Sequence, residues 1–201
     1  MKESRLKISA AAVLLLALLY YVSTPGEAAA ALCAVAVHEL GHAAALGILG
    51  MHIDGFRVDL KGFCIRYGGY SGALGHAFAA LAGPMAGISY AFAASSLAGK
   101  LALDWLELSS GISLLLSLFN LLPVLPLDGG RVFAALSCAV MGERAGGVLT
   151  EAVGLVLGTL LLSAGIWMMV KGHGIALELA AIWLLLYQET GRGLVKPREM
   201  I

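Results

Sequence analysis

Val37-His38-Glu39-Leu40-Gly41-His42 lies near the middle of an apolar segment that runs from Ala29 to Leu49. On a helix, residues four positions apart share one face, so the imidazoles of His38 and His42 converge about one turn apart. This spacing is typical of zinc ligands, and it places Glu39 to act on a water molecule at the metal rather than on the metal itself. The stretch therefore predicts a metal site inside a hydrophobic helix.

The energetics of the bilayer favour a bound metal at this cluster. An Asp, Lys or Arg at bilayer depth costs about 2.5 to 3.5 kcal/mol on insertion scales, whereas a structural zinc contributes about 10 to 16 kcal/mol of apparent binding free energy at pH 7. A bound metal can therefore offset the cost of placing His38, Glu39 and His42 in lipid. The alternative is that both histidines hydrogen-bond neighbouring helices and that Glu39 stays protonated.

The composition identifies the bilayer as the solvent of this chain. Of its 201 residues, 60% are hydrophobic and 13% are charged, and the mean hydropathy is +0.89. An average soluble protein has about 45 to 50% apolar and about 25% charged residues. The net charge of zero provides no basic field that would attract nucleic acid. Cys33, Cys64 and Cys138 have no CxxC spacing and are interpreted as small hydrophobic residues.

We predict an all-α polytopic membrane protein with about six transmembrane helices, because a spanning helix needs about 20 mostly apolar residues. The first span follows Lys2, Arg5 and Lys7, so it could instead be a cleaved secretory signal. The six expected spans are Ile8 to Tyr21, Ala29 to Leu49, Leu74 to Gly99, Leu108 to Leu127, Ala152 to Val170 and Ile175 to Tyr187.

The distribution of basic residues predicts the orientation. If the amino terminus is cytoplasmic and there are six spans, Lys100 and Lys171 fall outside and all other Lys and Arg fall inside. This agrees with the positive-inside rule. The chain is therefore expected in the cell membrane as a multi-pass protein with both termini in the cytoplasm.

Two stretches interrupt the helical pattern. His52 to Tyr70 alternates apolar and charged residues on both sides of Lys61-Gly62, which predicts a short membrane-associated β-hairpin between spans two and three. Ser109 to Gly142 contains Pro123 and Pro126, so a broken fourth span is expected. Non-helical backbone at membrane depth needs a polar interior. With no linker or repeat, the chain is expected to be a single domain, 1–201.

Two histidines do not complete a catalytic zinc site, which usually has three protein ligands and one open position. Asp128 differs from most other candidates because it follows Pro126-Leu127 in the broken span, at membrane depth. A turn aspartate paired with Arg131 is the alternative role for Asp128. The candidates for the third ligand are His52, His76, His173, Asp54, Asp59, Asp104, Asp128 and the glutamates.

The sequence resembles the site-2 proteases, a family of intramembrane zinc metalloproteases. The resemblance rests on three motifs that span about half the chain: His38-Glu39-Leu40-Gly41-His42, Ala82-Gly83-Pro84 and Asn120-Leu121-Leu122-Pro123-Val124-Leu125-Pro126-Leu127-Asp128-Gly129-Gly130-Arg131. It implies that His38, His42 and Asp128 bind one Zn²⁺ per chain and that Glu39 is the catalytic base. By the same resemblance, Asn120 would help to hold the substrate carbonyl or its oxyanion.

The resemblance also implies a function, a partner and an architecture. The chain looks most similar to compact members without a PDZ or CBS domain, of which the sporulation protease that releases a membrane-tethered sigma factor is one. The expected activity is zinc-dependent hydrolysis of a peptide bond in or near the transmembrane segment of a tethered substrate, with release of a cytoplasmic regulatory product. A membrane-tethered sigma or anti-sigma factor is a candidate substrate, and a membrane regulatory partner is a further candidate.

Alternative interpretations apply to the whole chain and to single motifs. Instead of a protease, the chain could be a non-proteolytic zinc-binding membrane protein, either a transporter or a binder of transmembrane segments. Gly69-Tyr70-Ser71-Gly72 matches the G-x-S-G of rhomboid-type serine proteases, but this pattern is much less specific than H-E-x-x-H in a Gly-rich chain. Asn120 could simply link helices by hydrogen bonds. Gly83 and Gly87 form a G-x-x-x-G pair that is expected to let helices approach closely.

Overall fold

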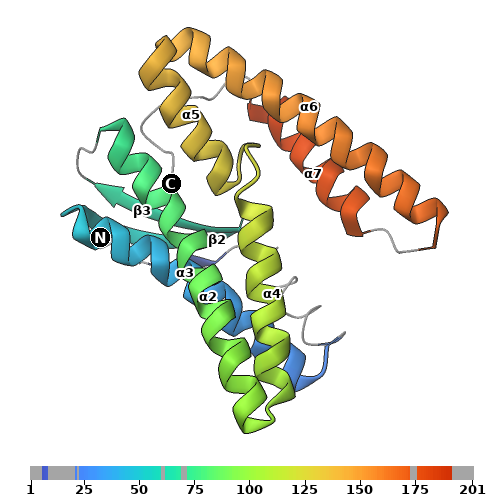
Figure 1. The fold of residues 1–201 in the computed structure, drawn as a ribbon. Coiled ribbons are helices and arrows are strands. Elements are labelled where there is room, and N and C mark those ends of the chain that lie inside the picture. The colour runs from blue at the N-terminus through green and yellow to red at the C-terminus, as the bar shows by residue number, and fades with distance from the viewer. Residues whose placement is uncertain are drawn as a thin grey trace. The chain divides into compact units, whose positions relative to one another are not determined.

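The computed structural model describes residues 6–8, 21, 23–59, 62–68, 72–172 and 176–191. In these residues the chain forms six helices and three strands (Figure 1). They divide between two compact units, one up to Asn120 and one from Leu121 onward. The boundary falls in the stretch where the sequence predicts a broken span.

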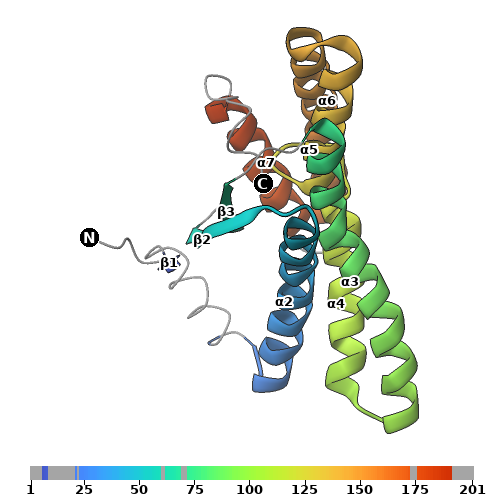
Figure 2. The same cartoon turned by 90° about the vertical axis from the view of Figure 1, so that its left-hand side faces the viewer.

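The helices of the first unit are α2 (Pro25–Ile48), α3 (Ala73–Leu101) and α4 (Asp104–Asn120). They lie side by side in both views of the ribbon (Figures 1 and 2). A capping box fixes the start of α2: the backbone N–H of Glu27 donates to Thr24 Oγ1, and the backbone N–H of Thr24 donates to the Glu27 carboxylate. Further along the same helix, His38 and His42 are among its buried residues.

A row of serines on α4 joins the three helices of the first unit. Ser109 and Ser113 are four residues apart and therefore share the buried face of α4. The Ser109 hydroxyl donates to the Ala30 carbonyl of α2 at 3.0 Å, and the Ser113 hydroxyl donates to the Gly87 carbonyl of α3 at 3.0 Å. Hydroxyl groups of this kind commonly hydrogen-bond across helices in an apolar environment.

The first unit also contains a three-stranded sheet in the order β1-β2-β3. Its strands are β1 (Leu6–Ile8), β2 (His52–Asp59) and β3 (Gly62–Gly68), and Figure 2 shows β2 following the end of α2. β1 runs parallel to β2, and β2 pairs antiparallel with β3, with Phe56 opposite Ile65. The antiparallel pair lies where alternation predicts a hairpin, and the expected turn at residue 61 lies outside the described residues.

The second unit consists of α5 (Asp128–Met141), α6 (Glu143–Val170) and α7 (Ala176–Gly191). α6 packs against both of the other helices through a stripe of small residues on its buried face. A Cβ added at Gly146 would overlap the backbone of Cys138 in α5, so the missing side chain lets the two helices approach closely. The stripe consists of Gly146, Thr150, Gly154, Gly158 and Gly165.

The expectation of six spans needs correction. Among the described residues, α2, α3 and α6 are long and apolar enough to cross a membrane. α4, α5 and α7 are shorter, with 17, 14 and 16 residues. The proline-containing segment after Asn120 ends α4, and α5 begins at Asp128. The stretch from Ser109 to Gly142 thus contains the end of one helix, at Asn120, and the start of another, at Asp128. The expected first span lies almost entirely outside the described residues.

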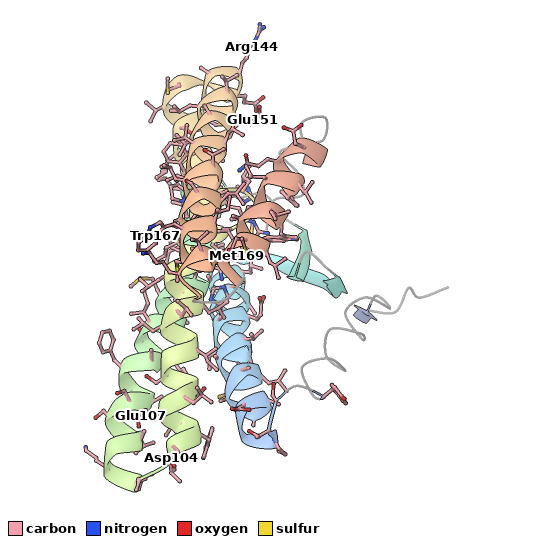
Figure 3. The ribbon with its side chains drawn as sticks, turned by 90° about the vertical axis from the view of Figure 1, so that its right-hand side faces the viewer. Asp104, Glu107, Arg144, Glu151, Trp167 and Met169 are labelled. Atoms are coloured by element: carbon pink, nitrogen blue, oxygen red, sulfur yellow. The ribbon has the colours of Figure 1, made fainter. Side chains whose placement is uncertain are left out.

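Several charged side chains lie in the first turns of the helices, and Glu151 lies further along α6. Asp104 and Glu107 lie in the first turn of α4, and Arg144 lies in the first turn of α6 (Figure 3). Trp167, near the other end of α6, is exposed and apolar. Exposed apolar side chains along the helices, with charges at the ends, are what a lipid-facing surface requires.

Candidate metal centre

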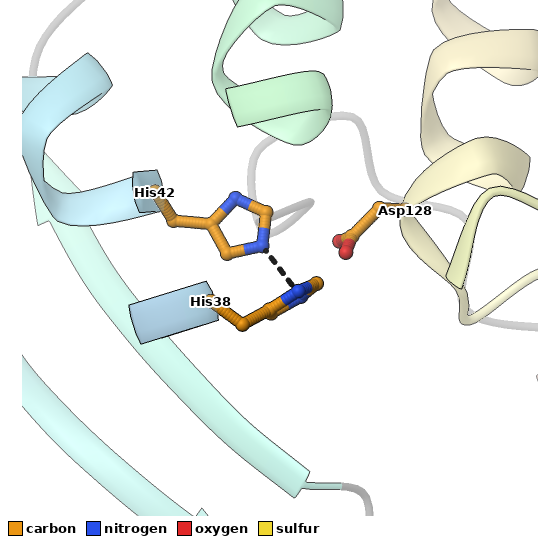
Figure 4. Close-up of side chains that lie close together, drawn as sticks. All are labelled: His38, His42 and Asp128. Atoms are coloured by element: carbon orange, nitrogen blue, oxygen red, sulfur yellow. Dashed lines mark hydrogen bonds between the residues drawn. The ribbon is translucent and has the colours of Figure 1, made fainter. Parts of the chain in front are cut away.

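His38 and His42 meet on the buried face of α2. Each has 4% of its surface exposed, and their Nε2 atoms lie 3.2 Å apart (Figure 4). The rings are nearly perpendicular, with an interplanar angle of 79° and centroids 4.9 Å apart. The convergence that the spacing predicts is therefore present, and both imidazoles are shielded from solvent.

A backbone carbonyl of α3 fixes the orientation of the His42 ring. His42 Nδ1 lies 2.8 Å from the Ala79 carbonyl oxygen. A carbonyl can only accept, so Nδ1 carries the proton and donates it, and the lone pair of a neutral ring is then on Nε2. Metal-binding histidines almost always use their second nitrogen in this way.

The geometry of the pair fits zinc. Two nitrogens that each bind a tetrahedral zinc at about 2.0 to 2.1 Å are about 3.3 to 3.4 Å from one another. The observed Nε2 separation of 3.2 Å is close to that value. His38, His42 and Asp128 each offer one buried ligand atom, an imidazole nitrogen or a carboxylate oxygen. Two nitrogens and one carboxylate oxygen form a common donor set for catalytic zinc.

Asp128 is the first residue of α5 and belongs to the second unit. It is 4% exposed, and its carboxylate oxygen Oδ1 lies 3.4 Å from Arg131 Nη1 one turn later. A negative charge in the first turn is favoured by the free N–H groups of the helix. Figure 4 also draws this carboxylate. The Arg131 contact is the one expected if Asp128 is only a turn residue, so the two roles need an experiment to separate them.

The loop before α5 packs tightly against the start of that helix. A Cβ added at Gly130 would overlap the backbone of Val124 and Leu125, and one added at Gly129 would overlap the Leu121 carbonyl. The preceding Leu125–Pro126 peptide bond is cis. The two glycines therefore let the loop fold back over the first turn of α5, and this fixes the backbone that carries Asp128.

Gly130→Ala is expected to destabilise the protein by about 1 to 3 kcal/mol, because the added methyl group must displace backbone atoms. The measurement is the thermal unfolding of the detergent-solubilised protein. Gly147→Ala on α6 is the matched control, since a Cβ there meets nothing within 4 Å. Equal midpoints for Gly130→Ala and wild type would contradict this account of the loop.

The other predicted site residues lie on the helices of the first unit. Glu39 follows His38 on α2 and is half-buried, and Asn120 is the last residue of α4. Asn120 Nδ2 donates to the Leu116 carbonyl at 3.0 Å, which leaves its second amide hydrogen for another acceptor. Among the other candidate ligands, Asp104 is exposed at the start of α4 and His76 lies in the first turn of α3.

Some candidate site residues fall outside the described residues, and the sequence did not reveal one group that orients a histidine of the site. His173 and the Gly69 to Ser71 part of the serine-protease motif lie outside them, and so do the side chains of His52, Asp54 and Asp59. The Ala79 carbonyl was not predicted. No sequence signal could have identified it, because every residue carries the same backbone acceptor.

Comparisons with known proteins agree on one family. The model of peptidase family M50 matches residues 70–164, a region that contains Asn120 and Asp128 but not the His38 to His42 motif. A protein described as putative zinc metalloprotease Rip3, from two strains of Mycobacterium tuberculosis, is 30% identical over 169 residues. That match covers 78% of this chain and 42% of the relative, so the chain spans less than half the length of the curated relatives it matches.

The fold itself matches a solved structure. A site-2 protease from Methanocaldococcus jannaschii superposes with a TM-score of 0.72 and covers 95% of this chain and 92% of its own. Its sequence is 20% identical, so this match concerns the fold. Together with the matched family model and the matched relatives, this fold match supports the expected resemblance to the site-2 proteases.

Proposed function

We propose that the chain is a zinc-dependent intramembrane endopeptidase. The observation that carries the proposal is the buried His38 and His42 pair, whose Nε2 atoms lie 3.2 Å apart while the Ala79 carbonyl holds His42 Nδ1. A fixed His42 tautomer, with its lone pair on the Nε2 that faces the second imidazole, suits a zinc ligand. The match to the model of a peptidase family and to relatives described as putative zinc metalloproteases supports a hydrolytic role for this site.

Three side chains would hold the zinc and two more would serve the reaction. His38, His42 and Asp128 are the proposed ligands of one zinc per chain, so one functional domain would need residues from both units. Bound zinc supplies Lewis acidity, which polarises a peptide carbonyl and acidifies water. Glu39 then takes the proton of the attacking water and returns it to the leaving amine. Asn120 donates its second amide hydrogen to the oxyanion.

The substrate must reach this site in an extended conformation, because a helix hides its carbonyls in internal hydrogen bonds. We propose that the substrate segment adds to the sheet of the first unit as a further strand. β2 is paired on both sides, by β1 and β3, whereas in the described residues β3 is paired only with β2. The outer edge of β3 (Gly62–Gly68) thus offers backbone donors and acceptors with little demand on sequence.

Proline substitutions along β3 are expected to separate the fold from substrate binding. Successive N–H groups of an edge strand point alternately toward its partner and away from it, so Cys64→Pro and Ile65→Pro remove donors on opposite sides. The variant that loses only an outward N–H should unfold like wild type and yet cleave substrate more slowly. If the variant that unfolds like wild type also cleaves at the wild-type rate, strand addition at β3 is wrong.

The proposed topology determines which product is released. With both termini in the cytoplasm and the ligands toward the cytoplasmic half of the cell membrane, cleavage would free a cytoplasmic regulatory domain. A membrane-tethered sigma or anti-sigma factor would carry such a releasable cytoplasmic domain. A membrane regulatory partner would control the access of the substrate to the site.

Mass spectrometry of a co-expressed substrate tests the proposal. The probes are single-span membrane proteins with a cytoplasmic domain, including tethered sigma and anti-sigma factors. Wild type is expected to produce fragments with new termini in or near the transmembrane segment, and Glu39→Gln is expected to produce none. If zinc-loaded wild type produces no such fragments from any of these probes, the result would favour a non-proteolytic zinc-binding protein.

A further inference from the structure

Two residues of α3, one turn apart, contact the same histidine. The Ala79 carbonyl accepts from His42 Nδ1 at 2.8 Å, and Gly83 lies against the other side of the ring. A Cβ added at Gly83 would overlap Nε2 and Cε1 of His42 and would lie 2.7 Å from Cδ2. α3 thus holds the imidazole between a carbonyl and a position that has no side chain.

The two glycines of the G-x-x-x-G pair therefore have different neighbours. The Cβ of an alanine at Gly87 would overlap Ser117 Oγ on α4, with Ser113 Oγ at 3.3 Å, and no atom of His42 is among its nearest neighbours. Gly87 lets two helices approach, as the sequence predicts. Gly83 instead leaves room for the side chain that presents Nε2.

We propose that Gly83 is a positioning residue for the metal site: its missing side chain keeps His42 Nε2 in the orientation that binds zinc. The inference rests on the proposed zinc function and extends it to a residue that binds no metal. An alanine at 83 would push the ring away from α3. The ring would then either lose the 2.8 Å hydrogen bond to Ala79 or turn its Nε2 from the partner nitrogen on His38.

A double-mutant cycle on the metal-free protein tests the contact directly. Gly83→Ala is expected to lower the unfolding midpoint by roughly 2 to 10 °C, because the added methyl group overpacks the contact with the His42 ring. In a His42→Ala background the imidazole is gone and the methyl group has space, so the same substitution should cost almost nothing. Gly87→Ala is the matched control, and its cost should be the same in both backgrounds.

Zinc binding provides a second readout, measured by competition with a chromogenic chelator at equilibrium. Gly83→Ala is expected to raise the zinc Kd by about 10- to 100-fold, the range found when an outer-shell partner of a ligand is lost. Gly87→Ala should leave the Kd unchanged in the folded protein. In the cobalt-substituted protein, the visible ligand-field bands should shift for Gly83→Ala and not for Gly87→Ala.

The outcomes distinguish this inference from the proposed function. If wild type binds zinc, His42→Ala does not, and Gly83→Ala binds like wild type, the zinc function stands and the role of Gly83 is wrong. If wild type binds no zinc, the proposed function fails, and the cycle still reports whether Gly83 and His42 are in contact. If Gly83→Ala does not fold, recovery of folding in the double variant supports the inference, and no recovery overturns it.

Discussion

Glu39→Gln is expected to lower the rate of substrate cleavage by about 10² to 10⁴-fold, the usual contribution of a positioned general acid–base group. Glutamine has the size of glutamate but cannot take up a proton at neutral pH. Glu39 lies beside His38 on α2 and is not one of the proposed ligands. The protein should therefore keep its zinc and its thermal stability while it loses activity.

Cleavage is measured with a co-expressed substrate, and zinc content is measured on the same purified protein by elemental analysis. Glu107→Gln is the matched control, because this carboxylate is exposed in the first turn of α4. Full activity in Glu39→Gln with a stoichiometric metal content would rule out Glu39 as the base. Loss of activity together with loss of metal would assign it a structural role in the site instead.

Asp128→Asn is expected to weaken zinc binding by more than about 100-fold, which exceeds the 10- to 100-fold effect of outer-shell partners. Asparagine keeps the shape of the side chain but removes its negative charge, and a neutral amide oxygen is a poorer zinc ligand than a carboxylate. The zinc Kd is obtained by chelator competition, and cleavage should fall in parallel. Treatment of wild type with a strong chelator should have the same effect, and added zinc should reverse it.

Arg131→Ala separates the two roles of Asp128. The Arg131 guanidinium lies 3.4 Å from the Asp128 carboxylate, so both substitutions break the same ion pair. If Asp128 is only a helix-start residue, the two variants should have similar stability and wild-type zinc affinity. If Asp128 is a ligand, only Asp128→Asn should lose zinc. Asp104→Asn, an exposed acid at the start of α4, controls for the loss of one negative charge.

Several features of this protein follow from local sequence. The i, i+4 spacing places His38 and His42 on one face of α2 wherever that helix packs. The prolines after Asn120 end α4, because proline lacks the N–H that the next helical turn needs. Alternation in the segment that begins at His52 is typical of strands. Each of these features depends on residues within a few positions along the chain.

Other features could not be predicted, because they depend on distant parts of the chain. β1 pairs in parallel with β2, with Leu6 opposite Phe56, although the sequence reads as a hairpin of two strands only. Counting charge-free stretches overestimated the number of spans. The stretch around α7 is apolar, but the helix it forms has only 16 residues. A pairing partner fifty residues away leaves no local periodicity.

The sequence by itself determined the chemistry: two imidazoles one turn apart, a neighbouring carboxylate, and an apolar helix that makes them costly without a metal. Only the tertiary structure decided how that chemistry is held. It assigned the Ala79 carbonyl to His42 Nδ1 and gave Gly83 and Gly87, identical in sequence terms, an imidazole and a serine as neighbours. The physical reason is that the sequence specifies the type of each side chain, whereas the packing of the helices determines which atoms surround that side chain.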